Sequence, residues 1–277
     1  MPKNNQEKQK KTSVLSRRDI LQILGATGGA ALITGLVTSG PLSPEAVQGI
    51  KRQSGGHLVA NGKYQWKMVI DLEECIGCQY CIWACQATND VPDDEMRWNV
   101  GFPERTAGGT DFYMTRPCMH CQDAPCVKVC PVGATWIRED GLVAMDYDRC
   151  IGCRYCQVAC PYDARRFNWE VIDEDNPYQP TWGTSEVSRR DRGVIEKCTF
   201  CQHRIDRAIE EGLTPGVDRA ATPACVNACP VGARVFGDAN NPDSPVSRYI
   251  AQHETFRIRE DFGTQPNVLY VRPEKES

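Results

Sequence analysis

Short apolar segments dominate the hydrophobic pattern of this 277-residue chain, and no long periodic segment follows its first 40 residues. Apolar runs predict strands at 67–71, 233–236 and 267–271. Helices are predicted at 82–88, 203–211 and 245–253. Hairpins are predicted where 96–102 faces 111–115 and across 135–146, where Asp140-Gly141 is a strong turn signal. Elements this short and mixed indicate an α+β fold.

The N-terminal residues follow a different pattern. A basic stretch ends in Ser16-Arg17-Arg18, and a glycine-broken apolar stretch follows at 20–38. This order of regions looks like a twin-arginine export signal, predicted at 1–39 and followed by a linker at 40–65. The signal predicts a periplasmic location or one on the outer face of the cytoplasmic membrane. Because about 20 apolar residues can span a bilayer, an uncleaved anchor remains an alternative.

Composition narrows the classes of partner. The chain has a formal net charge of −4, of which the first 39 residues contribute +4, so the remainder carries −8. An acidic body argues against a nucleic-acid partner. With 41% hydrophobic residues, 23 glycines and 18 prolines, we expect a small core.

Cysteine supplies the candidate chemistry. Residues 150–161 read C-x2-C-x2-C-x3-C-P, the bacterial ferredoxin spacing in which three thiolates bind one [4Fe–4S] cluster and the fourth binds another. Three further runs use every other cysteine, so that 16 thiolates match four [4Fe–4S] clusters with none left over. The four runs are Cys75, Cys78, Cys81 and Cys85; Cys118, Cys121, Cys126 and Cys130; Cys150, Cys153, Cys156 and Cys160; and Cys198, Cys201, Cys225 and Cys229.

Disulfides and zinc are the alternatives. An exported chain with an even number of cysteines is typical of a disulfide scaffold, but disulfides leave the regular spacing unexplained. Zinc sites use separated cysteine pairs, whereas three cysteines within seven residues occur twice here. The twin-arginine route is expected to carry proteins already folded around their cofactors, so clusters and export are compatible.

Several residues beside the cysteines have two interpretations. Basic side chains near ligands would raise the potential of a cluster, or form surface salt bridges. Aromatic neighbours shield clusters from water or simply pack, and the histidines are expected to form hydrogen bonds or lie at the surface rather than bind iron. No catalytic motif is present. These residues are Arg149, Arg154, Arg165 and Lys197; Tyr80, Trp83, Tyr155, Tyr162 and Phe200; and His120 and His203.

The cysteine pattern resembles the iron–sulfur (β) subunits of the dimethyl sulfoxide reductase superfamily, and looks most like tetrathionate and polysulfide reductase subunits. The resemblance covers 66–272, including Cys160-Pro161-Tyr162-Asp163-Ala164-Arg165 and Gly232-Ala233-Arg234. It implies two tandem bacterial-ferredoxin-like modules, each with two clusters. The implied segments are one module from 66–116 with 194–238, a second from 117–165, a connecting loop at 166–193 and a C-terminal docking extension at 239–277.

The resemblance also implies crossed ligation within each module. One module would hold its clusters on Cys118, Cys121, Cys126 and Cys160, and on Cys150, Cys153, Cys156 and Cys130. The other would hold them on Cys75, Cys78, Cys81 and Cys229, and on Cys198, Cys201, Cys225 and Cys85.

By this resemblance, the chain is a non-catalytic electron-transfer subunit of an exported oxidoreductase used in anaerobic respiration. It would relay electrons between a membrane quinone-interacting subunit and a molybdopterin catalytic subunit. One alternative is a molybdenum-free quinone- or cytochrome-linked membrane complex, and another is a soluble ferredoxin-like carrier. The terminal substrate, the direction of electron flow and the cluster potentials stay open.

Removing the metal should unfold most of this protein, because a small core leaves much of the folding free energy to metal ligation. We expect protein stripped of iron under anaerobic, reducing conditions to lose its near-ultraviolet circular dichroism and its cooperative thermal transition. Cluster-loaded protein in the same buffer is the control. A cooperative, native-like melt of the metal-free chain would contradict the prediction.

Overall fold

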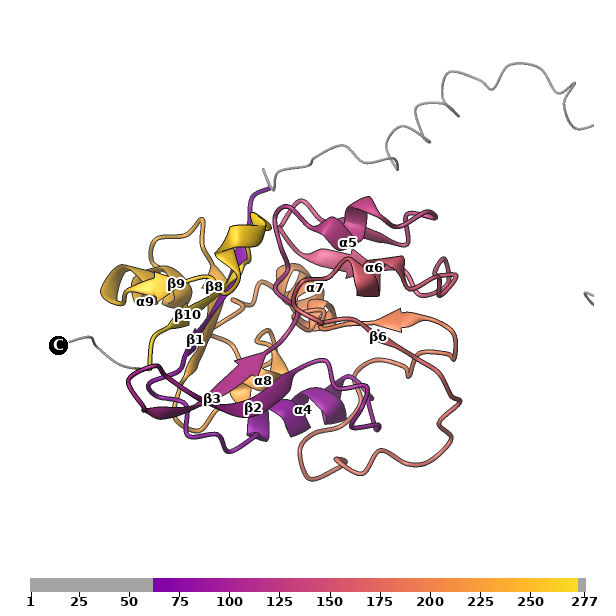
Figure 1. Ribbon diagram of the computed structural model, residues 1–277, viewed down its shortest axis with the longest axis horizontal. Coiled ribbons are helices and arrows are strands. Elements are labelled where there is room, and N and C mark those ends of the chain that lie inside the picture. The colour runs from indigo at the N-terminus through magenta and orange to yellow at the C-terminus, as the bar shows by residue number, and fades with distance from the viewer. Residues whose placement is uncertain (1–61, 274–277) are drawn as a thin grey trace, which may run out of the picture. The chain divides into compact units, whose positions relative to one another are not determined.

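The computed structural model describes residues 62–273 (Figure 1). The predicted export signal and positions 40–61 of the predicted linker lie outside the described residues. The strands are β1 (Trp66–Asp71), β2 (Val100–Arg105), β3 (Asp111–Arg116), β4 (Thr135–Ile137), β5 (Val143–Met145), β6 (Arg166–Phe167), β7 (Ile195–Glu196), β8 (Arg234–Asp238), β9 (Thr255–Phe256) and β10 (Val268–Val271). The helices are α4 (Tyr80–Thr88), α5 (Pro125–Lys128), α6 (Tyr155–Val158), α7 (Gln202–Glu211), α8 (Ala224–Asn227), α9 (Pro245–Gln252) and the 3₁₀ turn η1 (Glu260–Phe262).

A four-stranded sheet in the order β8-β1-β10-β9 joins the two ends of the described chain. β1 pairs antiparallel with β8 and parallel with β10, which follows it by almost 200 residues. Successive side chains of β1 point to opposite faces of the sheet. Both faces are covered, so apolar residues occur on both. Met68 and Ile70 belong to the main buried cluster, whereas Val69 packs with α9 residue Val246 in a smaller cluster on the other face.

The C-terminal segment is part of this sheet. β10 lies between β1 and β9, and Val268 and Tyr270 are fully buried. Positions 255–271 are therefore needed to complete the fold, and the expectation of a docking extension throughout 239–277 is too broad. The cause is the parallel pairing with β1, which no local pattern in the sequence indicates.

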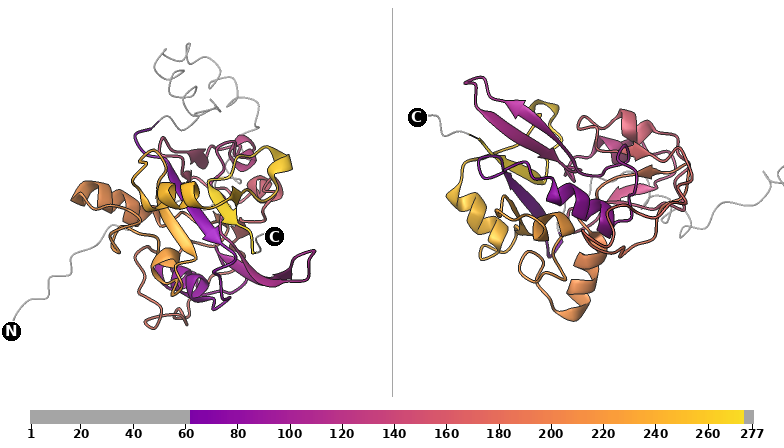
Figure 2. Two further views of the ribbon diagram at one scale, coloured as in Figure 1. Left: turned by 90° about the vertical axis from the view of Figure 1, so that its left-hand side faces the viewer. Right: turned by 90° about the horizontal axis from the view of Figure 1, so that it is seen from below.

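The predicted local elements are present, with shifted boundaries. Both hairpins form, with Gly141 in the left-handed region at φ 84° in the second. The first hairpin begins at Val100, so the positions 96–99 expected in its first strand lie outside it. α7 ends at Gly212 as predicted, and the Ser244 side chain caps α9 by accepting a hydrogen bond from the Ser247 amide. Both α7 and the tip of the first hairpin project from the body in the two views of Figure 2.

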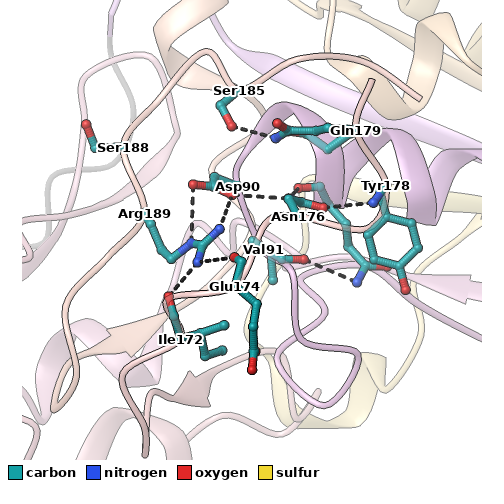
Figure 3. A network of polar contacts seen from close by, with 12 residues as sticks. Asp90, Val91, Ile172, Glu174, Asn176, Tyr178, Gln179, Ser185, Ser188 and Arg189 are labelled. Carbon is teal, nitrogen blue, oxygen red and sulfur yellow. Dashed lines mark hydrogen bonds and ion pairs between the residues drawn. The ribbon is translucent and has the colours of Figure 1, made fainter. Parts of the chain in front are cut away.

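The connecting loop at 166–193 is tied down by polar contacts. Arg189 forms an ion pair with Asp90 at 3.0 Å, and the Asn176 amide donates to the Gln86 carbonyl at 3.0 Å (Figure 3). β6 and β7 close the loop as a two-stranded ladder that the sequence did not predict. Arg189, Arg190 and Asn176 of this loop therefore fasten it to the end of α4 and the residues just after it. Among residues 62–273, no helix has the length and apolarity needed to cross a membrane.

Asn267 joins four segments at the start of β10. Its side-chain amide donates to the carbonyls of His120 (2.8 Å) and Gly141 (3.2 Å), and its side-chain oxygen accepts from Gln65 (3.2 Å) and Gln122 (3.1 Å). The residue is fully buried. The run-two loop, the second hairpin and the sheet therefore share one hydrogen-bonded side chain.

Replacing Asn267 should destabilise the whole described region. We expect Asn267→Ala to cost roughly 2–4 kcal/mol, because it leaves buried donors and acceptors without partners. Loss of clusters makes unfolding irreversible, so the measurement is the apparent Tm of cluster-loaded variants at one scan rate.

The matched control is Asn240→Ala, at an exposed asparagine whose side chain donates to two loop carbonyls at 3.3 and 3.4 Å. This change should alter stability by no more than about 0.5 kcal/mol. Equal Tm values for the two variants would contradict a structural role for Asn267.

Candidate iron–sulfur sites

The four cysteine runs share one backbone feature. The residue immediately before the second cysteine is in the left-handed region in every run, with φ of 70° at Gly77, 43° at His120, 66° at Gly152 and 54° at Phe200. This conformation turns the chain back on itself, so that the loop can direct successive side chains to one side. At Gly152 a side chain is also excluded by space, because a Cβ would lie 2.1 Å from the Gly193 carbonyl oxygen. The close approach is thus to the neighbouring loop that contains Gly193.

His120 and Phe200 hold a conformation that normally favours glycine. A non-glycine residue there costs on the order of 1–2 kcal/mol. Both side chains are buried, and their rings lie 3.9 Å apart between centroids. The Val143 amide donates to His120 Nδ1 at 3.0 Å, and burial lowers the pKa of His120 well below its usual value, helped by Lys197. Packing between runs two and four therefore stabilises both strained residues and keeps the imidazole neutral.

The thiols of Cys75, Cys78, Cys81 and Cys229 line one cavity together with Tyr113 and Arg234. This set combines three cysteines of run one with the last cysteine of run four. A second cavity is lined by Cys150, Cys153 and Cys156 of run three and by Cys130 of run two. In each case the structure brings together residues from two runs that the family resemblance pairs.

The other two sets lie inside the protein. Burial raises the pKa of the Cys85 thiol well above its ordinary value, and the neighbouring thiols of Cys198, Cys201 and Cys225 raise it further. Burial likewise raises the pKa of Cys121, beside Cys118, Cys126 and Cys160. Of these eight thiols, all are buried except that of Cys160, which is partly exposed.

The inner sets are neighbours across the two halves of the protein. Burial raises the pKa of Cys198, and among neighbouring thiols that of Cys118, from the other half, raises it furthest. The cavity-lining sets are the more accessible, and Cys153 is exposed. The thiol sets therefore follow one another from a surface, through the interior, to a second surface.

Amide groups are directed at several sulfurs. The Ala134 amide donates to Cys130 Sγ at 3.2 Å, and the Phe200 amide donates to Cys198 Sγ at 3.4 Å. The Asn89 side chain lies 3.6 Å from Cys85 Sγ and 3.8 Å from Cys201 Sγ. Such donors stabilise sulfur that carries negative charge, as iron-bound thiolate does.

These residues fit [4Fe–4S] clusters. All 16 cysteines are free thiols, so disulfides do not compete for them. Four separated thiolates around a common space suit a cubane, which supplies one-electron transfer when bound.

The basic residues predicted near the cysteines fall into two groups. Arg165 and Lys197 are buried, with Arg165 Nη2 3.1 Å from Cys126 Sγ. Arg149 is a partly exposed residue 4.0 Å from Asp146, so the salt-bridge interpretation fits it. Arg154 lies over the Trp169 ring, 4.6 Å from its centroid. Sequence reasoning gave no role to Arg234, which is buried among thiols of two runs.

The remaining candidates make packing contacts. Tyr80 and Trp83 cluster with Trp182, and Tyr155 is 63% exposed, so none of the three is enclosed with a thiol set. Tyr162 is buried and shares a hydrogen bond of 2.5 Å with Thr264. His203 Nε2 lies 3.3 Å from the Glu186 carboxylate and contacts no iron ligand set.

Two regions of the chain match the family described as the 4Fe-4S dicluster domain, residues 110–176 and residues 149–233. Two domains with two clusters each correspond to four [4Fe–4S] clusters, the number that the cysteines provide.

Relatives match most of the chain. A protein of Halobacterium salinarum assigned as an iron–sulfur subunit of dimethyl sulfoxide reductase is 45% identical over 223 residues, covering 75% of this chain and 79% of the relative. The iron–sulfur cluster-binding subunit of menaquinone reductase from Nitratidesulfovibrio vulgaris is 42% identical, covering 76% and 89%. A tetrathionate reductase subunit of Salmonella typhimurium is 37% identical, covering 92% and 88%.

The fold class, the four clusters and the electron-transfer role are thereby confirmed. The relatives are subunits of reductase complexes, so this chain too is one part of a larger oxidoreductase. The chain belongs to the iron–sulfur subunits of the dimethyl sulfoxide reductase superfamily, which carry four [4Fe–4S] clusters on two dicluster domains.

Proposed function

We propose that this chain relays electrons between a membrane subunit that reacts with quinone and a molybdopterin catalytic subunit. The observation that carries the proposal is the succession of thiol sets, which begins at one surface cavity and ends at another. A soluble carrier needs only one accessible centre. A protein with accessible sets at both ends of a buried pair suits a relay between two partners.

The proposed ligands are those of crossed ligation. In order along the relay, the sets are Cys75, Cys78, Cys81 and Cys229; Cys85, Cys198, Cys201 and Cys225; Cys118, Cys121, Cys126 and Cys160; and Cys130, Cys150, Cys153 and Cys156. The two cavities support the outer sets, and the mutual influence of neighbouring thiols on their pKa values supports the inner sets.

The two proposed modules follow from the same assignment. Packing of α4 against α8, and pairing of β1 with β8, support a module from 66–116 with 194–238. Packing of α5 against α6 supports a second module at 117–165. Each of the helices α4, α5, α6 and α8 contains the third cysteine of one run, and the fourth cysteine lies in the same helix or just after it. These helices therefore bring the third and fourth cysteines toward their sets.

Each end of the relay offers a contact for a partner. Ile76 and Ile151 occupy the same place in runs one and three, between the first and second cysteines, and are 66% and 63% exposed. An exposed isoleucine beside an accessible thiol set suits an interface that excludes water around the electron path. We therefore propose that a different subunit covers each of these loops.

Location and partners rest on further arguments. The Ser16-Arg17-Arg18 sequence supports export by the twin-arginine route and a position on the outer face of the cytoplasmic membrane. Relatives named as subunits of tetrathionate reductase and dimethyl sulfoxide reductase support a reductase as the catalytic partner.

A second candidate function is favoured by the menaquinone reductase relative, which is 42% identical. In that case the chain would serve a quinone-linked membrane complex without molybdenum. The thiol sets would be the same, and only the partner at one end would differ.

Metal content separates these two functions. We expect the native complex, purified anaerobically from membranes, to contain molybdenum or tungsten together with about sixteen irons from this chain. The same fractions from cells lacking this chain are the control. Iron and haem without molybdenum or tungsten would overturn the molybdopterin partner and leave the quinone-linked complex.

Crossed ligation is tested by three cysteine variants studied by electron paramagnetic resonance. Cys81→Ser and Cys229→Ser should alter the same cluster signal, because these residues belong to one proposed set although they lie in runs one and four. Cys225→Ser, only four residues from Cys229, should alter a different signal. If Cys229→Ser instead matches Cys225→Ser, each run binds its own cluster and the assignment is wrong.

A further inference from the structure

Two arginines occupy the same place in the two halves of the protein. Arg165 is the fifth residue after Cys160, and Arg234 is the fifth residue after Cys229. Each follows the last cysteine of a run, and their side chains are almost fully buried, at 1% and 4% exposure. The repeated position indicates that the two arginines have the same role in the two halves.

Arg165 lies between two thiol sets. Its Nη2 donates to Cys126 Sγ at 3.1 Å and to Thr135 Oγ1 at 2.9 Å, and its Nη1 lies 3.6 Å from Met145 Sδ. The guanidinium also lies close enough to Cys156, a member of the neighbouring set, to act on its thiol. One cation therefore lies beside the third cysteine of run two and the third cysteine of run three.

Arg234 repeats this arrangement. Its Nη2 donates to Asn99 Oδ1 at 3.0 Å, and its Nη1 lies 3.7 Å from Met68 Sδ. It lies close to Cys225 and Cys81, which are the third cysteines of runs four and one. Each arginine thus faces a methionine sulfur, a neutral oxygen acceptor and one thiol from each of two sets.

Neither arginine pairs with a carboxylate among residues 62–273. Burying an unpaired guanidinium is costly, and arginine does not lose its proton in proteins. Arg165 Nη2 instead lies 3.1 Å from Cys126 Sγ, and Arg234 lines the same cavity as Cys81. The thiolates are therefore the counterions of both arginines.

We propose that Arg165 and Arg234 are shared counterions, each of which raises the reduction potentials of both clusters in its module. The proposal rests on the ligand assignment made above. An electron added to either cluster of a module increases the negative charge beside the same guanidinium. Because the surroundings are dry, the attraction is only weakly screened.

Lys197 is not included. It is fully buried, and its Nζ donates to the carbonyls of Val143 and Cys198 at the boundary between the halves. A buried lysine can be neutral, whereas a guanidinium stays charged. The inference is therefore confined to the two arginines.

Redox titration of the intact complex, followed by electron paramagnetic resonance, tests the proposal. Arg165→Gln should lower the potentials of the two clusters held by runs two and three and leave the other two unchanged. Arg234→Gln should lower the opposite pair. The signals are assigned with the cysteine variants, so failure of the ligand assignment is recognised separately from failure of the arginine effect.

The matched control is Arg149→Gln, at a partly exposed arginine next to Cys150 whose charge is solvated and 4.0 Å from Asp146. It should leave the four potentials unchanged. Arg165→Met and Arg234→Met remove the charge with an unbranched apolar side chain and should lower the same pairs of potentials as the glutamine variants. They also test the proposal if a glutamine variant fails to load iron.

Three results would overturn the inference. The first is a glutamine or methionine variant with all four clusters and unchanged potentials. The second is a shift of only one cluster of a pair. The third is an Arg149→Gln variant whose potentials fall as far as those of the variants at Arg165 or Arg234.

Discussion

The burial of negatively charged sulfur is the constraint on which the rest of this structure depends. Sixteen thiols share one small body, and cysteines of all four runs belong to its largest buried cluster. Burial raises the pKa of thiols such as Cys85 and Cys121, so these sulfurs favour their protons until iron replaces them. Folding and metal binding are therefore coupled. Backbone amides, the Asn89 side chain and the buried arginines all favour the metal-bound state, because each stabilises negative charge on sulfur.

The sequence predicted local structure better than long-range structure. The helix ending at Gly212 and the hairpin at Asp140-Gly141 carry their own stop and turn signals, and both formed. The cysteine spacing indicated four clusters before any fold was known. The family resemblance, rather than spacing, supplied the partner of each fourth cysteine.

What the sequence could not predict depends on pairing between distant segments. β6 and β7 are two residues each and meet across the connecting loop, so neither has a pattern of its own. β10 looks like any short apolar run, and only its parallel pairing with β1 makes it a central strand. Arg234 was overlooked for the same reason, since its neighbours come from β1, α4, α8 and the segment before β2, which are far apart in the chain. A residue whose role is set by tertiary neighbours leaves little local signal.

The four cysteine loops reach the same left-handed backbone conformation with different residues. The outer loops belong to runs one and three, and the inner loops to runs two and four. All four place a left-handed residue before the second cysteine, but the outer loops use Gly77 and Gly152 while the inner loops use His120 and Phe200. Glycine is required outside because Tyr113 and the Gly193 carbonyl crowd those positions. Inside, a side chain is tolerated because the two rings pack against each other in a tilted arrangement and fill space between the halves. The strain at these residues is thus offset by packing at the place where water must be excluded. The boundary between the two halves is therefore held by the same residues that shape the inner thiol loops, as the proposed relay through both halves requires.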